Sequence, residues 1–366
     1  MRDREVLVLT PPQDGWQTVQ GSRRYLHGGT RYRNLADEIL SPHAEVVHLD
    51  WTPNRAPDGR LSEAQAIVLA PWLPWPGVLE LPAFDEAGWQ RTPNLRAIAG
   101  TFDYRLGWID LEAAARRDAV VVDTSRTMRW TVAEFGVAIT LSLLRDIPAA
   151  IDVVRRGGWP DAPMGEGVYV FRDLADCRVG LAGYGSINRR YRSFIEPYGC
   201  AVTIFDPIVG DDVARGDRVA RAPSLVELAR ASDILVVAIP PTPSTLGVID
   251  AAVIDALAPG SLFVLLSRMA VVEQDALWRR VQAGELRAAI DVFEPEPPAP
   301  DAWFRRDPHV LPTPHIAGNV RFAQERCFAE ACADVVRVLD GEEPLHPATV
   351  RDKRLYDGTL SSAGAR

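Results

Sequence analysis

Lysine is nearly absent from this chain of 366 residues: Lys353 is the single lysine among 40 basic residues. This scarcity excludes chemistry that needs a lysine in the folded core, such as a P-loop phosphate site or a Schiff base. The cationic groups are therefore arginines, which suit planar carboxylate recognition but do not carry protons. Any site for an anion is expected to be built on arginine.

Cysteine and long apolar runs are also scarce. The four cysteines have no CxxC or zinc-ligand spacing, so we interpret them as reduced packing residues of a cytoplasmic protein: Cys177, Cys200, Cys327 and Cys332. No segment approaches the roughly 20 apolar residues that span a bilayer, and the opening MRDREVLVLTPP predicts a strand rather than a signal peptide. The net charge of -9 argues against nucleic acid or an anionic membrane as the main partner.

The length favours two domains, and β-rich apolar runs alternate with helical patterns, which predicts an α/β fold with parallel sheets. The first set of expected strands is EVLVL, AEVVHL, AQAIVLA, LRAIAG and AVVVDT, with a helix at Leu111–Arg117. The second set is RVGLAG, AVTIFD, ILVVAI, SLFVLL, RAAID and HVLPTP, with helices near 225–231, 249–256 and 274–283. Long helices are expected at Thr131–Gly158, broken at Pro148, and at Asn319–Leu339, followed by a mobile tail from Arg351.

The stretch VGLAGYGSIN predicts a turn that binds a dinucleotide. Gly183 would make the tight turn after a strand, and Gly185 would let a pyrophosphate approach the first N–H groups of a helix. Asn188 occupies the third glycine position and should push the helix slightly outward. Asp206 ends the next strand, where a carboxylate binds ribose hydroxyls and favours NAD over NADP. The alternative is a glycine-rich turn with a capping or surface aspartate.

Acid–base residues follow three later strands. Arg268, Asp291, Glu296 and His315 are expected to meet at the carboxyl edge of the second sheet, where ligands of parallel sheets bind. Together they suit hydride exchange at a carbon that carries a hydroxyl: Arg268 grips the carboxylate and keto oxygen of a 2-keto acid, and His315 transfers the proton. Glu296 would fix and tune the imidazole, and Asp291 would bond the nicotinamide carboxamide. Taken singly, each of these residues more often serves a surface, a loop or a linker, and their joint order after successive strands favours the catalytic interpretation.

These motifs resemble the D-isomer-specific 2-hydroxyacid dehydrogenases. The likeness runs from Pro93 to Glu343, through PNLRAIAG, IDLEAAARR, TVAEF, VGLAGYGSIN, VTIFDP, TPSTLGVI, SRMAVVEQDAL, IDVFEPEP and TPHIAG. It implies two Rossmann-like doubly wound domains, with an NAD-binding domain (146–318) inserted into a flavodoxin-like substrate domain (1–145 plus 319–366). It also implies that the site lies between the domains and that the enzyme is a homodimer built on its cofactor domains.

The resemblance also assigns residues. Arg268, Glu296 and His315 would be the catalytic set. Residues that would bind NAD are Gly183, Gly185, Ser186, Ile187, Asp206, Ile239, Pro240, Thr245, Leu266, Ser267, Asp291 and Gly318. Residues that would bind the substrate are Thr101, Phe102, Asp103, Arg105 and Arg129.

The chain departs from the family pattern in residues that bear on substrate choice. Arg126 and Arg129 stand where small residues and proline are common, and Arg105 lies in a substrate loop that is one residue longer than usual. At least one of them is hypothesised to meet a second anionic group on the substrate; the alternative is pairing with acids such as Asp103, Asp123 or Glu134.

The sequence therefore predicts an NAD-dependent oxidoreductase that interconverts a 2-keto acid and its (R)-2-hydroxy acid. One alternative is a dehydrogenase for a phosphorus-containing or other unusual oxyanion on the same fold. The other is a cofactor-sensing binding protein, like the corepressors that share this fold and retain such a catalytic set.

Overall fold

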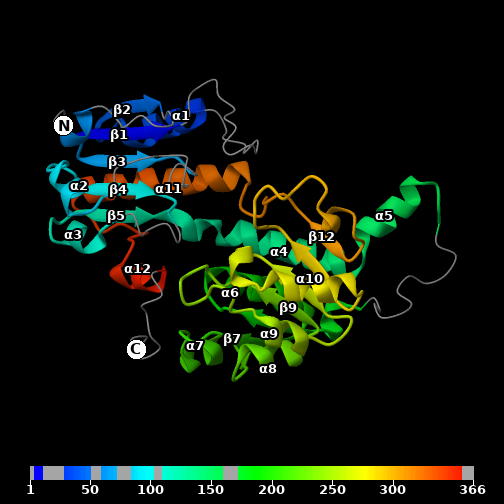
Figure 1. Cartoon of the computed structure of the whole chain (residues 1–366). Coiled ribbons are helices and arrows are strands. Elements are labelled where there is room, and N and C mark those ends of the chain that lie inside the picture. The colour runs from blue at the N-terminus through cyan, green and yellow to red at the C-terminus, as the bar shows by residue number, and fades with distance from the viewer. Residues whose placement is uncertain are drawn as a thin grey trace. The chain divides into compact units, whose positions relative to one another are not determined.

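The computed structural model of the chain describes residues 4–10, 29–50, 59–71, 84–102, 109–159 and 172–356. The chain forms two compact units (Figure 1). Unit 1 comprises residues 1–128 and 319–359, and unit 2 comprises 129–318 with 360–366. The predicted substrate domain includes residues 129–145, whereas these residues group with unit 2. The predicted domain functions stay predictions at this point.

Unit 1 is built on a parallel sheet of order β2-β1-β3-β4-β5, a flavodoxin-like order. Its strands coincide with the predicted apolar runs: β1 Glu5–Thr10, β2 Glu45–Asp50, β3 Ala66–Leu69, β4 Ala97–Gly100 and β5 Val120–Asp123. The central strands are buried on both faces, which explains why their sequences are continuously apolar rather than alternating.

Helices cover this sheet, and the longest comes from the far end of the chain. Helix α11 (Arg321–Asp340) packs its buried stripe, including Phe328, Ala331 and Val335, into the core of unit 1 (Figure 1). The shorter helices are α1 Gly29–Leu40, α2 Glu86–Gln90, α3 Leu111–Ala115 and α12 Val350–Tyr356, with 3₁₀ turns η1 Gly59–Ser62 and η3 Thr124–Met128.

Helix α12 corrects the expectation of a mobile tail from Arg351. The first turn is fixed because Thr349 and Asp352 hydrogen-bond to each other through backbone and side chain at 2.7–3.1 Å. The polar composition of this segment therefore belongs to a capped helix and not to a mobile tail. Residues 357–366 lie outside the described residues.

Unit 2 carries a second parallel sheet, of order β12-β11-β10-β9-β6-β7-β8. Its strands are β6 Arg178–Ala182, β7 Ala201–Phe205, β8 Ala220–Arg221, β9 Ile234–Val237, β10 Leu262–Leu265, β11 Arg287–Ile290 and β12 Val310–Pro312. The chain order reverses between β6 and β9, which makes their carboxyl ends the switch point where ligands of doubly wound sheets bind. The two-residue strand β8 was not predicted.

The helices of unit 2 flank the sheet: α4 Arg129–Leu144, α5 Ile147–Arg155, α6 Ser186–Ile195, α7 Asp211–Gly216, α8 Leu225–Arg230, α9 Ala251–Ala256 and α10 Gln274–Gln282. Short 3₁₀ turns are η4 Leu174–Asp176, η5 Glu196–Tyr198, η6 Met269–Val271 and η7 Trp303–Arg305. No helix in the described ranges combines the length and apolar character that a bilayer crossing needs.

The predicted break in the long helix is present. Helices α4 and α5 separate at Asp146, whose φ is +49°, and Pro148 occupies the first turn of α5, where its missing N–H costs nothing. Arg287 of β11 fixes this corner because its buried guanidinium donates to Leu143 O (2.8 Å) and to the Asp146 carboxylate.

The four cysteines form no disulfide, and three of them are buried. Burial raises the pKa of the Cys177 thiol to about 11 and that of Cys327 to about 12. These thiols stay protonated near neutral pH and act as packing groups.

Candidate active site

The glycine turn lies at the switch point of unit 2. Gly183 follows β6 with φ +77°, and a Cβ there would come within 3.2 Å of Ala238 O. Gly185 is the N-cap of α6, and a Cβ added there meets nothing within 4 Å. The first position thus needs glycine for conformation and close approach. The second leaves open space before the N–H groups of Ser186 and Ile187, as an approaching phosphate requires.

Asn188 has a role that was not foreseen. It is fully buried, and its Nδ2 donates to Gly183 O at 2.6 Å and to Ala182 O at 3.2 Å. The amide thus joins the first turn of α6 to the end of β6. The glycine expected here would provide close packing but no such bonds.

Asp206 follows β7 and is hydrogen-bonded to the glycine turn. Its Oδ2 accepts from Tyr184 N (2.7 Å), and its Oδ1 accepts from Ile208 N (2.8 Å) and Val209 N (3.0 Å). These bonds fix the carboxylate beside the turn. Each carboxylate oxygen accepts two hydrogen bonds, so Oδ2 retains capacity for a ribose hydroxyl.

Further residues assigned to the cofactor surround this edge. Ile239 and Pro240 follow β9, and Thr245 Oγ1 donates to Pro240 O (2.5 Å) and accepts from Thr242 N (2.7 Å). Leu266 and Ser267 follow β10 and are buried, and the Oγ of Ser267 has no hydrogen-bond partner among the described residues.

Arg268, the predicted carboxylate-binding residue, follows β10 in an extended conformation. One of its guanidinium nitrogens donates to the carbonyl of Ser267 at 2.7 Å. The neighbouring strands β11 and β12 lead to the other predicted catalytic residues, so all of these loops leave the same edge of one sheet.

His315 and Glu296 are in contact. His315 Nδ1 lies 2.9 Å from Glu296 Oε2, and Glu296 Oε1 accepts from Phe293 N at 3.0 Å. Burial alone raises the pKa of the Glu296 carboxyl, but the hydrogen bond and charge of His315, the Phe293 N–H and the charge of Arg268 outweigh it. The pKa of Glu296 therefore lies below its ordinary value, and the carboxylate is ionised near neutral pH. An ionised partner at Nδ1 orients the imidazole and selects its tautomer.

Asp291 organises the loop that carries His315. Its Oδ1 accepts from Thr313 Oγ1 (2.6 Å) and Ile316 N (2.9 Å), its Oδ2 accepts from Ala317 N (2.9 Å), and its carbonyl accepts from His315 N (2.9 Å). His315 has φ +54° in the middle of these bonds. The sequence predicted Asp291 as a carboxamide-binding residue; its visible contacts are with the catalytic loop.

The predicted substrate residues of unit 1 are only partly described. Thr101 and Phe102 are buried, and the Phe102 ring belongs to the core of unit 1. Phe102 N donates to Asp123 Oδ1 at 2.9 Å. Asp103 and Arg105 lie outside the described residues, so their role stays a prediction.

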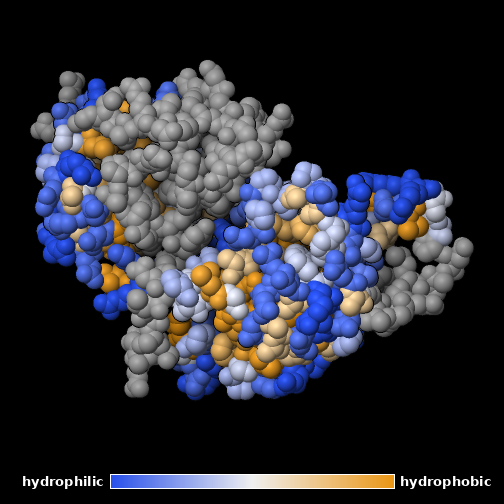
Figure 2. Space-filling view, viewed as in Figure 1, coloured by the Kyte–Doolittle hydropathy of each residue, from blue (hydrophilic) through white to orange (hydrophobic). Residues whose placement is uncertain are grey.

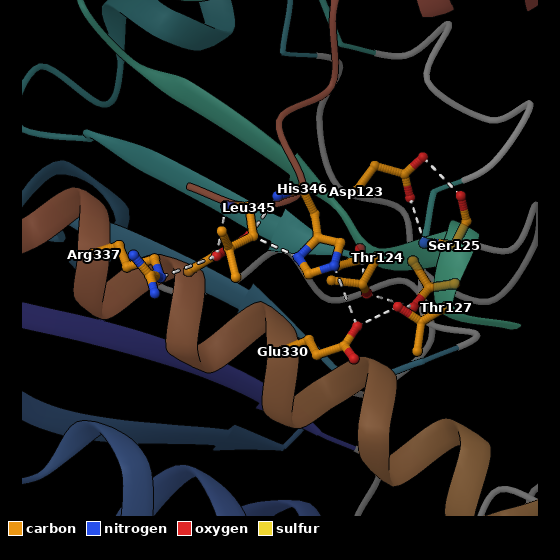
Figure 3. A network of polar contacts seen from close by, with 11 residues as sticks. Asp123, Thr124, Ser125, Thr127, Glu330, Arg337, Leu345 and His346 are labelled. Carbon is orange, nitrogen blue, oxygen red and sulfur yellow. Dashed lines mark hydrogen bonds and ion pairs between the residues drawn. The ribbon is translucent and has the colours of Figure 1, made fainter. Parts of the chain in front are cut away.

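A network of hydrogen bonds and ion pairs surrounds Asp123 (Figure 3). Ser125 bonds Asp123 through both its N–H and its hydroxyl, Thr127 donates to Glu330 of α11, and His346 lies between Glu330 and the buried Asp334. The network ties η3 to α11 and to the segment after it.

Arg126 and Arg129 differ in their partners. Arg126 forms an ion pair with Asp352 of α12, which is none of the three acids named as its expected partners. Arg129 opens α4 in unit 2, and its Nε is buried without a hydrogen-bond partner among the described residues.

Strand order, glycine turn and acidic residue define the class of unit 2: it is a Rossmann-type dinucleotide-binding domain. The same conclusion comes from comparison with known families. Residues 137–317 match the family model "D-isomer specific 2-hydroxyacid dehydrogenase, NAD binding domain". Unit 2 therefore belongs to the NAD-binding domains of the D-isomer specific 2-hydroxyacid dehydrogenase family.

Individual relatives carry names from the same family. D-3-phosphoglycerate dehydrogenase of Haemophilus influenzae is 30% identical over 277 residues, which cover 74% of this chain and 65% of the relative. The enzyme of the same name from Rattus norvegicus is 29% identical over 64% of this chain, but this match covers only 43% of the relative. The match thus spans less than half of some relatives. Among solved structures, a phosphoglycerate oxidoreductase from Rhizobium etli has a TM-score of 0.74 at 25% identity, covering 94% of this chain and 98% of its own.

Proposed function

We propose that this protein is an NAD-dependent oxidoreductase that interconverts a 2-keto acid and the corresponding (R)-2-hydroxy acid. The observation that carries the proposal is the 2.9 Å contact between His315 Nδ1 and Glu296 Oε2 at the sheet edge that also carries the glycine turn. The unpaired cysteines support a cytoplasmic location.

The residues at the switch point fit NAD. The open space before Gly185 and the N-terminus of α6 suit the diphosphate, and Asp206 suits the adenosine ribose hydroxyls. Ser267 Oγ and the backbone beyond Ile239, Thr245 and Gly318 are further candidates for contact. When bound, NAD supplies or accepts the hydride.

Each of the catalytic residues has a separate role in the reaction. Arg268 binds the carboxylate and polarises the keto oxygen, where negative charge develops during reduction. His315 delivers a proton to that oxygen from Nε2, because Nδ1 faces Glu296. Glu296 keeps the imidazole oriented and stabilises its protonated form. In oxidation the same groups act in reverse.

Turnover with a His315 variant tests the proposal. The wild type should consume NADH with members of a panel of 2-keto acids, and His315→Ala should lower kcat by at least about 100-fold. NADH binding, followed by fluorescence, should persist in the variant. His309→Gln is the matched control, because His309 lies directly before β12, at the opposite end of the strand from His315, and pairs with Asp307.

Two outcomes would overturn the proposal. If His315→Ala retained activity, the acid–base assignment would be wrong. If the wild type bound NADH but reduced no member of the panel, a cofactor-sensing protein would become the better account.

We further propose that the protein forms a homodimer through its cofactor-binding unit. Helix α5 projects from unit 2 and has no buried residue (Figure 1). Ile147, Ile151 and Val154 are 42–52% exposed and recur at helical spacing on one face. Both polar and apolar residues are visible on this projection (Figure 2). Ile151→Asp should shift the mass measured by light scattering from dimer to monomer; an unchanged mass would exclude this face.

A further inference from the structure

We propose that Arg129 binds a second anionic group of the substrate, so that the preferred substrates are 2-keto or 2-hydroxy acids with a distal carboxylate or phosphate. This inference rests on the proposed function, because it assigns the reacting carboxylate to Arg268. It concerns a residue of unit 2 only.

The first turn of α4 directs Arg129 toward the catalytic loops. On the same helix, Val132 lies 3.7 Å from the position of a Cβ on Gly318, and Gly136 closely approaches Leu266. Arg129 lies three residues before Val132 and seven before Gly136, which places it on the same stripe of the helix. That stripe faces the loops after β10 and β12, which carry Arg268 and His315.

The adjacent residue fixes the rotation of this turn. Trp130 packs on α6, where its ring lies 3.4 Å below the guanidinium carbon of Arg190 and 5.7 Å from the Phe194 ring. Because Trp130 is held against α6, Arg129 occupies a different face of α4.

The Nε of Arg129 lacks an acceptor. This atom is buried and has no hydrogen-bond partner among the described residues. Three other arginines are engaged: Arg126 with Asp352, Arg190 with Trp130 and Arg287 with Asp146. A buried donor without an acceptor is unfavourable, and an anionic ligand removes that cost.

Arginine suits an anionic group at this place because its planar fork binds carboxylate or phosphate through two hydrogen bonds. Ser267 Oγ, which is also buried without a partner among the described residues, stays a candidate contact of the cofactor.

Matched substrate pairs test the inference. The pairs are 2-oxobutyrate with oxaloacetate, 2-oxovalerate with 2-oxoglutarate, and hydroxypyruvate with its 3-phosphate, each assayed with NADH. The wild type should prefer, in kcat/KM, the member with the second anionic group in at least one pair. Arg129→Gln should lower that preference by about 10- to 100-fold, mainly through KM, and Arg129→Lys should restore part of it.

The control is Arg126→Gln, which removes a nearby guanidinium that is already paired and should leave the preference unchanged. The inference is overturned if the wild type reduces both members of every pair equally, or if Arg129→Gln lowers both equally. It is also overturned if the variant weakens NADH binding without changing the preference, since the cofactor diphosphate would then be the anion. A wild type that reduces none of the six acids contradicts the proposed function itself.

Discussion

At the scale of single residues, His315 has a backbone conformation that a histidine seldom adopts. A positive φ outside glycine costs on the order of 1–3 kcal/mol and persists only where the surroundings enforce it. Here the enforcing group is Asp291, which bonds the residues on both sides of His315. We therefore regard Asp291 as a positioning residue for the imidazole.

Asp291→Asn tests that role. An amide must turn one N–H donor toward Ile316 N or Ala317 N, so hydrogen bonds are lost and about 1–3 kcal/mol of unfolding free energy with them. The kcat should fall together with stability, whereas Thr313→Val, which removes a single donor, should have a smaller effect. Urea unfolding and steady-state kinetics measure both. A variant that only raises KM for NADH would instead assign Asp291 to the cofactor.

Glu296 makes stability depend on pH. Because its pKa is lowered in the folded state, its contribution is fully present above the ordinary glutamate pKa of about 4.3 and disappears as pH falls through the lowered folded value. Glu296→Gln should therefore be less stable than the wild type at pH 7, and the difference should shrink below about pH 4. Urea unfolding at pH 7, 5 and 3.5 measures it. A difference that is constant over this range would contradict the ionised pair.

At the scale of elements, the junction of β6 and α6 depends on Asn188. Asn188→Ala removes its bonds to Ala182 O and Gly183 O and should cost about 1–2 kcal/mol of unfolding free energy. Asn188→Gly restores the expected glycine and should cost about 1 kcal/mol more than alanine, because glycine disfavours a helix interior. Thermal unfolding of the two variants measures this order. Equal or greater stability of either variant would show that the amide bonds are dispensable.

The strands were predictable from the sequence, and several other features were not. Buried parallel strands such as β3 and β9 are continuous apolar runs and can be read directly. The two residues of β8 are exposed and belong to no such run, and the cap of α12 consists of polar residues that also suit a tail. The boundary near residue 128 depends on what α4 packs against, which no local pattern contains.

The catalytic residues were predictable in type and order, because each follows a strand of the second sheet. Their supporting bonds were not. Asp291 contacts residues 22 to 26 positions away, and Asn188 reaches carbonyls that any residue type would present. Conversely, the pairing of Arg126 with Asp352 joins residues 226 positions apart, which the sequence did not suggest.

At the scale of the whole molecule, binding of the cofactor should raise the free energy of unfolding. A ligand at 100 times its Kd raises the unfolding free energy by about 2.7 kcal/mol. NADH should raise the unfolding temperature more than NADPH at the same concentration, since the Asp206 carboxylate repels a 2′-phosphate. Thermal unfolding with each cofactor measures the difference, and an equal or larger shift with NADPH would remove Asp206 as the selecting group.

The most direct measurement of the central claim follows the transferred atom. A 2-keto acid that the protein accepts is reduced with NADH deuterated at both C4 positions, and the product is analysed by mass spectrometry and chiral chromatography. The account predicts one deuterium at C2 of an (R)-2-hydroxy acid. An (S) product, or a product without deuterium at C2, would contradict it.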